Sequence, residues 1–120
     1  MYLYHPEFFI SAVTNIADEK TVLVRARKRR DLTAFLELCC VHEIVDEFAK
    51  QIQHLKKNDY PYRLVLPKHE FSGALAILAL QVNYPSVKDA VDPNRPLRLQ
   101  LYYELYALTK QRFEEDDNAS

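Results

Sequence analysis

Apolar residues near the start of the chain recur at every second position, which is the spacing of β-strands. Two such runs, 8–15 and 20–27, are rich in β-branched and aromatic residues and are separated by the four residues IADE. A later run, YRLVL at 62–66, has the same character and is bounded by prolines. The pattern therefore predicts a β-hairpin near the N-terminus and a further strand in the middle of the chain.

Helical spacing replaces this alternation in three other stretches. Asp31 is placed to cap the first of them, which the apolar residues extend to about residue 49 as one long helix. A second helix is expected over 68–83 and a third over about 96–113, where Pro96 suits the first turn. Strands and helices in one short chain indicate the α+β class.

The segment 50–56 fits two structures. Ile52 and Leu55 continue the helical stripe, whereas Ile52 and His54 fit the alternation of a strand. Periodicity alone leaves the choice open.

Composition limits the class of protein. The single glycine excludes a glycine-rich loop of the kind that cradles phosphates. Cys39 and Cys40 are adjacent, a spacing that resists an unstrained disulfide and matches no zinc pattern, so we expect reduced thiols in a cytoplasmic protein. The first residues lack an export signal, and no apolar run approaches the ~20 residues that cross a membrane. We expect one domain over 1–113 and an acidic, disordered tail at 114–120.

Several short motifs follow one another along the chain: YLYHPEFFISAV, VRARKRRDL, NDYPYRLVLPK and NYPSVKDAV, before a tyrosine-bearing terminal helix. In this order they resemble a family of small bacterial proteins with the motifs VRAR-x-R-x-x-L, DY-x-YR-hydrophobic-VP and DY-x-NFK, over about residues 2–110. The resemblance implies a strand at about 50–56 and no established activity. The chain departs from the family at Ser86 and Val87, in place of asparagine and phenylalanine, and at Leu105 and Tyr106, in place of valine and tryptophan.

With a strand at 50–56, the element order becomes β-β-α-β-β-α with extra C-terminal helices. This order is a circular permutation of the ferredoxin-like arrangement. We expect a four-stranded antiparallel or mixed sheet in the order 1-2-4-3, with strands 2 and 4 as parallel central neighbours reached by a right-handed crossover. The helices then cover one face, and the other face is open or covered by a partner.

Alternation places arginines on the open face. Arg25 and Arg27 share one face of the second strand with Leu23, and Arg63 joins them from the last strand. Six of the sixteen Lys and Arg residues lie within 20–30, although the formal net charge is −1. The candidate basic cluster consists of Arg25, Arg27, Arg29, Arg30 and Arg63. Neighbouring guanidinium groups repel one another unless carboxylates or phosphates lie among them.

Three sources of negative charge remain open for this cluster. Acidic side chains of the chain's own loops or tail are the simplest source, and an acidic protein partner is the next. Nucleic acid is the alternative and ranks behind a protein partner, because single-strand RNA readers place aromatic rings on the central strands, whereas this chain has arginines there.

Two helices carry more apolar surface than one sheet face can bury. In the helix 68–83, the stripe with Ile77 and Leu80 is left over, and the terminal helix carries Tyr102, Tyr103 and Tyr106. These surfaces either pack on each other or form an interface, of which a homodimer is the simplest kind.

No motif points to catalysis or to a cofactor. The nearest approach to a metal site is Cys39, His42 and Asp46, which are one helical turn apart, but polar residues on exposed helical faces are common. We therefore expect a non-catalytic binding protein without metal, cofactor, small-molecule substrate or membrane partner. It is predicted to act through a protein partner or a homodimer interface, and a nucleic-acid-binding module is the alternative.

Overall fold

The computed structural model describes residues 1–39 and 42–119, and for residues 42 and 43 the backbone alone. The chain forms two compact units, 1–83 and 84–120, and each is described by itself. The boundary at residue 83 differs from the boundary that was expected at residue 113, between a domain and a tail.

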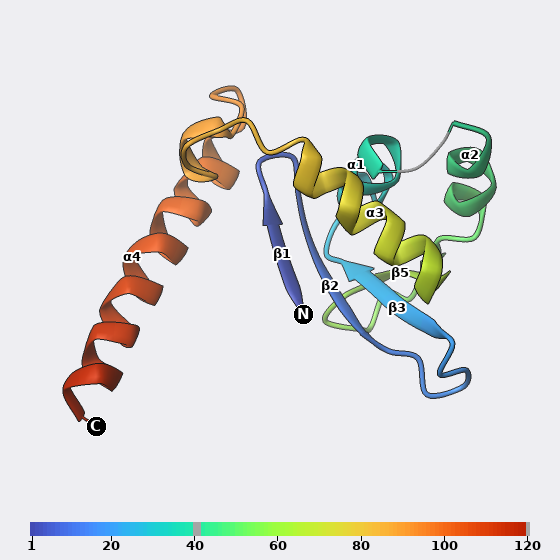
Figure 1. Cartoon of the computed structure of the whole chain (residues 1–120), viewed down its shortest axis with the longest axis horizontal. Helices are drawn as coiled ribbons and strands as arrows, with labels where there is room; N and C mark the ends of the chain where they lie inside the picture. The colour runs from blue at the N-terminus through green and yellow to red at the C-terminus, as the bar shows by residue number, and fades with distance from the viewer. Residues whose placement is uncertain (40–41, 120) are drawn as a thin grey trace. The chain divides into compact units, whose positions relative to one another are not determined.

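The first unit holds the sheet, whose elements can be followed in Figure 1. Its strands are β1 (Tyr2–His5), β2 (Phe8–Thr14), β3 (Thr21–Ala26), β4 (Gln53–His54) and β5 (Tyr62–Pro67). Its helices are α1 (Arg29–Cys39), α2 (His42–Lys50) and α3 (Lys68–Leu80). The second unit contains the short 3₁₀ helix η1 (Lys88–Ala90) and the long helix α4 (Pro96–Ala119). The predicted α+β class is confirmed.

The strands form one antiparallel sheet in the order β1-β2-β3-β5-β4. The hairpin β2–β3 and the strand β5 were predicted, and the segment 50–56 contains the two-residue strand β4. The four predicted strands lie in the predicted order. The sheet has a fifth strand, β1, which the sequence reasoning missed, so the expected count of four was wrong.

The two central strands β3 and β5 are antiparallel, and the expected parallel pairing was wrong. The reason lies in the hairpin that joins β4 to β5, because it reverses the chain direction between them. The strand that runs parallel to β3 is therefore β4, and β5 lies between the two. The connection through α1 and α2 links β3 to β4.

The first predicted helix is two helices in the structure, because α1 ends at Cys39 and α2 begins at His42. The apolar stripe of α1 includes Leu36 and Cys39 and would continue at residues 42 and 43, which are histidine and glutamate. Polar residues at these positions interrupt the stripe, so one amphipathic helix through residue 49 was the wrong prediction.

Helix α4 is longer than expected, and α3 is shorter. α3 ends at Leu80, whereas α4 continues through Ala119, so residues 114–119 are helical where a disordered tail was expected. Arg112 lies one turn before Glu115 and forms an ion pair with it over 3.1 Å. Such contacts between neighbouring turns favour continuation of the helix into the acidic residues.

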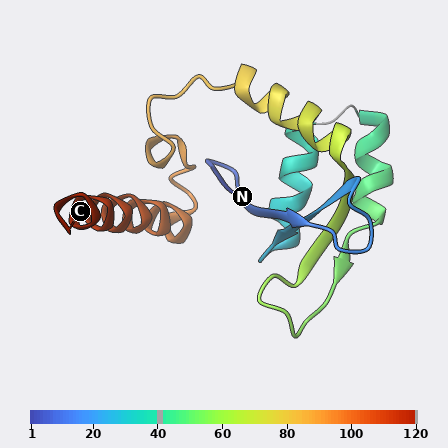
Figure 2. The ribbon, with the colours of Figure 1, turned by 60° about the horizontal axis from the view of Figure 1, so that its bottom comes forward.

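The core lies between one face of the sheet and the helices. From the sheet it contains Phe8, Ile10, Val24, Ala26, Leu64 and Leu66, and from the helices Leu32, Phe35, Leu36, Phe71 and Ala74. Figure 2 shows α1, α2 and α3 on one side of these strands. Each large apolar side chain buried here contributes roughly 1.5–3 kcal/mol to stability. Within this unit, the opposite face of the sheet has no helix over it.

Asp31 fixes the start of α1 against the sheet. It lies in the first turn of the helix and not at the expected cap, is almost fully buried, and accepts a hydrogen bond from the N–H of Phe9 at 3.0 Å. In the register of β2 with β3, Phe9 would face residue 27, but β3 ends at Ala26. The carboxylate therefore replaces the ladder partner that the end of β3 does not supply.

We expect Asp31→Ala to lower the free energy of unfolding by about 1–3 kcal/mol, because it leaves the Phe9 N–H without this acceptor. Urea denaturation followed by circular dichroism measures the change. Asp18→Ala is the matched control, since that carboxylate accepts the N–H of Lys20 at 3.0 Å in an exposed turn. A loss no larger for Asp31→Ala than for the control would contradict this role.

Candidate binding surface on the open face of the sheet

A single row of side chains crosses the sheet on the face opposite the helices. The register pairs Tyr2 with Ser11, Ser11 with Arg25, Arg25 with Arg63, and Arg63 with Gln53. Directly opposed residues of antiparallel strands point to the same face. Arg25 and Arg63 are therefore neighbours on the open face, as the alternation predicted.

Tyr60 gathers the arginines of this face. The Cζ atoms of Arg25 and Arg27 each lie 4.7 Å from the centroid of its ring, and Nε of Arg63 donates to its carbonyl oxygen at 3.2 Å. The loop between β4 and β5 presents Tyr60 to the face, and a bond from the N–H of Leu55 to the carbonyl of Pro61 closes this loop. The negative face of the ring attracts both guanidinium groups and so offsets part of their repulsion. We call Tyr60, Arg25, Arg27 and Arg63 the Tyr60 cluster.

In the described residues, the arginines of the Tyr60 cluster form hydrogen bonds but no ion pairs with carboxylates. Arg25 donates from Nη2 to Oγ of Ser11 at 2.9 Å, and Arg27 donates from Nη1 to the carbonyl of Asp59 at 3.4 Å. Among residues 1–39 and 42–119, no ion pair involves any of the three arginines. Within the same residues, Nε of Arg25 is buried without a hydrogen-bond partner. The cluster can therefore accept an anion without losing an existing ion pair.

Three aromatic rings stand beside the Tyr60 cluster. Phe9 of β2 stacks on Tyr4 at 4.6 Å and on Tyr2 at 5.9 Å, measured between ring centroids. Tyr2 and Tyr4 are 57% and 43% exposed. The interaction with the side chain of Tyr60 is the main cause that raises the pKa of Tyr2, so the two side chains lie near each other. We call Tyr2, Tyr4 and Phe9 the ring stack.

The sequence reasoning missed the ring stack because it did not predict β1. A usable signal was present, since Tyr2 and Tyr4 alternate with Leu3 and His5 in the manner of a strand. Leu3 packs against the core and His5 stacks on Phe8, on the other face of the sheet. Burial is the main cause that lowers the pKa of His5.

Arg29 and Arg30 do not take part in the Tyr60 cluster. Both lie in the first turn of α1, and Nη2 of Arg29 donates to the carbonyl of Ala49 near the end of α2 at 3.2 Å. The basic stretch 25–30 is thus divided between the open face and the helical side. Of the five arginines in the candidate cluster, Arg29 and Arg30 therefore do not belong to it.

The apolar candidates on α3 are exposed within the first unit. Ile77 is 37% exposed and Leu80 is 88% exposed. Gly73 lies one turn before Ile77, and a Cβ atom added to it would meet no atom within 4 Å. This outer side of α3 is therefore an uncovered apolar surface of the unit.

The three tyrosine candidates on α4 have different environments. Tyr102 is only 4% exposed and accepts a hydrogen bond from Arg98, so it is not a surface residue. Tyr103 is exposed, and its hydroxyl donates to Oδ1 of Asp89 at 3.0 Å, which raises the pKa of Tyr103. Tyr106 is also exposed, and Lys88 of η1 lies over its ring.

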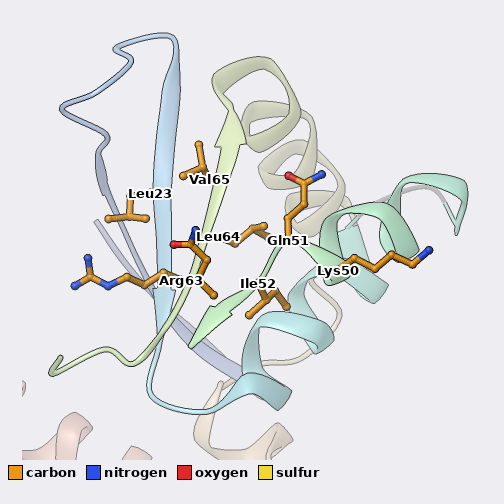
Figure 3. Close-up of a pocket in the computed structure, with 8 residues that line it drawn as sticks. Leu23, Lys50, Gln51, Ile52, Arg63, Leu64 and Val65 are labelled. Carbon is orange, nitrogen blue, oxygen red and sulfur yellow. The ribbon is translucent and has the colours of Figure 1, made fainter. Parts of the chain in front are cut away.

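A cavity of about 450 Å³ lies at the Arg63 end of the row. It is lined by Leu23, Lys50, Gln51, Ile52, Gln53, Arg63, Leu64 and Val65. In Figure 3 the charged ends of Lys50 and Arg63 point away from each other. The two cations do not converge on one ligand position, so we do not assign this cavity as an anion site.

Neither a cluster of metal ligands nor a membrane-spanning helix is found in the described part of the chain. Within it, no group of three His, Cys, Asp or Glu side chains is placed to hold a metal ion. Of the residues weighed for a metal or a disulfide, Cys39 is buried, whereas Cys40 and the side chain of His42 lie outside the described residues. Over these same residues, no helix is both long enough and apolar enough to cross a membrane.

The comparisons with known proteins suggest no function, so a proposal has to be based on the geometry of the open face. The resemblance to small bacterial proteins stays a prediction that is based on the short motifs. A scan against models of protein families, a search of curated proteins and a search of solved structures each found no match.

Proposed function

We propose that this protein is a small, non-catalytic binding module whose open sheet face takes an anionic macromolecular partner. One observation carries the proposal: the Tyr60 cluster holds three arginines together with no carboxylate paired to them in the described residues. Grouping like charges costs free energy, and a bound anion returns it as charge-assisted hydrogen bonds. The cluster is therefore better suited to a bound state than to an empty one.

The arginine side chains are held in place before a partner arrives. The hydroxyl of Ser11 and the ring of Tyr60 hold Arg25, while the backbone carbonyl of Asp59 and the same ring hold Arg27. Binding to groups that are already ordered costs less conformational entropy than binding to free side chains. The planar guanidinium also suits the paired oxygens of a carboxylate or a phosphate. An acidic protein and a nucleic acid both meet these requirements.

The attraction is local and not a property of the whole molecule. The formal net charge is −1, so the chain as a whole does not draw in a polyanion from a distance. Affinity then depends on contacts at the Tyr60 cluster. We further propose a cytoplasmic location, because the adjacent residues Cys39 and Cys40 resist an unstrained disulfide and so suit a reducing compartment.

A second candidate function is self-association through α3. The observation in its favour is the apolar outer side of this helix, where Ile77 and Leu80 are exposed within the first unit. A surface of this kind favours contact with another apolar surface, and a two-fold dimer is the simplest assembly that buries it.

We expect the double substitution Arg25→Gln/Arg27→Gln to weaken binding to labelled heparin and poly-L-glutamate at least tenfold, because it removes two charge-assisted contacts. Fluorescence anisotropy at about 50 mM salt measures the binding, in the range where such contacts are strongest. Lys110→Gln/Arg112→Gln is the matched control, since it removes the same charge from exposed positions on α4. Equal losses in the two variants would overturn the role of the Tyr60 cluster.

We expect light scattering over a dilution series to show a dimer that Ile77→Lys or Leu80→Lys converts to a monomer. A charge at either position is buried without a partner only in the assembled state. Ile16→Lys is the matched control, because Ile16 is an isoleucine that is 98% exposed in the turn between β2 and β3, outside α3. The mass of a single chain for the unsubstituted protein at the highest concentration would contradict self-association.

A further inference from the structure

We propose that the anionic partner is a single-stranded nucleic acid, whose bases stack on the ring stack while its phosphates bind the Tyr60 cluster. This inference rests on the proposed function, since it uses the same open face. It adds the chemical class of the partner and a second group of contacting residues. Both come from the first unit of the chain.

The exposed rings distinguish a nucleic acid from an acidic protein. Arginines alone serve either partner, but Tyr2 and Tyr4 are 57% and 43% exposed on the same face as those arginines. Phe9 stacks on both and thereby holds their orientation. An aromatic side chain next to a guanidinium group is the combination that binds single strands, because each nucleotide carries both a flat base and a phosphate. Stacking contributes about 1–3 kcal/mol for each base.

The rings and the cations are close enough to act on one strand. Tyr2 and Arg25 occupy the same row of the sheet, with Ser11 between them. Neighbouring strands are ~4.8 Å apart, so the two backbone positions are separated by ~10 Å. The base and phosphates of one or two nucleotides span this distance. The side chain of Tyr60 also interacts with that of Tyr2, so the ring stack lies beside the Tyr60 cluster.

The same geometry favours a single strand over a duplex. A ring can stack only on a base whose face is free, and in a duplex the neighbouring base pairs cover these faces. The phosphates of a duplex can still meet the three arginines, but the ring stack then contributes nothing. We therefore expect the preference for single strands to depend on Tyr2 and Tyr4, and the dependence on salt to come from the arginines.

Fluorescence anisotropy with labelled ten-nucleotide oligo-dT and oligo-U, and with a DNA duplex of the same length, tests the inference on the full chain. We expect Tyr2→Leu/Tyr4→Leu to weaken binding of both single strands at least tenfold and to leave binding of heparin and poly-L-glutamate unchanged. Arg25→Gln/Arg27→Gln should weaken all of these. With three phosphates bound, the logarithm of the affinity should fall with the logarithm of the salt concentration with a slope of about −2.

Two further variants keep the test decisive if the double tyrosine variant does not fold. Tyr2→Phe retains the ring and removes only the hydroxyl, and should bind oligo-dT within about threefold of the unsubstituted protein. Tyr4→Leu alone should lose affinity for oligo-dT and oligo-U but not for heparin. Tyr106→Leu, which alters an exposed ring on α4, is the control and should change neither.

The outcomes separate this inference from the proposed function. Binding of poly-L-glutamate through the arginines, without binding of oligonucleotides, would overturn the nucleic acid and favour an acidic protein partner. Equal affinity for duplex and single strands, or full retention of single-strand binding by the folded tyrosine variants, would overturn the role of the ring stack. If the arginine variant matched its control with every anion, the proposed function would fail as well.

Discussion

The register of β3 against β5 is the constraint on which both faces of the sheet depend. It places Val24 opposite Leu64 toward the helices and Arg25 opposite Arg63 on the other side. A slip of one residue would exchange the faces, and would bury guanidinium groups against Phe35 and Phe71 while exposing the core. The large cost of burying a charge therefore fixes the register as firmly as the apolar packing does. The packing of the core and the position of the arginines on the open face both follow from the register of β3 with β5.

The parts of this fold that follow from alternation could be predicted, whereas the direction of β5 in the sheet could not. The hairpin β2–β3, the strand β5 and the helical side of the sheet were all read from spacing. The direction of β5 was not predicted correctly. It is set by the loop between β4 and β5, and this loop has no periodic pattern. The division between α1 and α2 was visible in the polar residues 42 and 43 but was not used.

In the candidate site as well, residues on the predicted strands could be placed from the sequence, whereas residues on loops and helix ends could not. Spacing was sufficient to place Arg25 and Arg63 on one face, because strands fix the direction of their side chains, and Arg27 follows directly after β3. It was not sufficient for Tyr60, whose ring reaches the arginines from a loop, or for Arg29, whose position follows from the start of α1. Arg29 was assigned to the cluster because it is close to Arg25 in sequence, but the chain leaves the sheet after Ala26. Two of the three rings of the ring stack, those of Tyr2 and Tyr4, come from β1, which is only four residues long.

The shortness of β4 has a consequence for how the sheet behaves in a crowded solution. Because β4 pairs with only Tyr62 and Arg63, the later part of β5 forms an open margin of the sheet. Such margins can recruit strands from other molecules and start aggregation. Here the margin ends at Pro67, which has no N–H to donate, and α3 begins at the next residue. The exposed edge of β5 is therefore too short to pair stably with a strand of another molecule. The sheet can leave this edge unpaired without promoting aggregation.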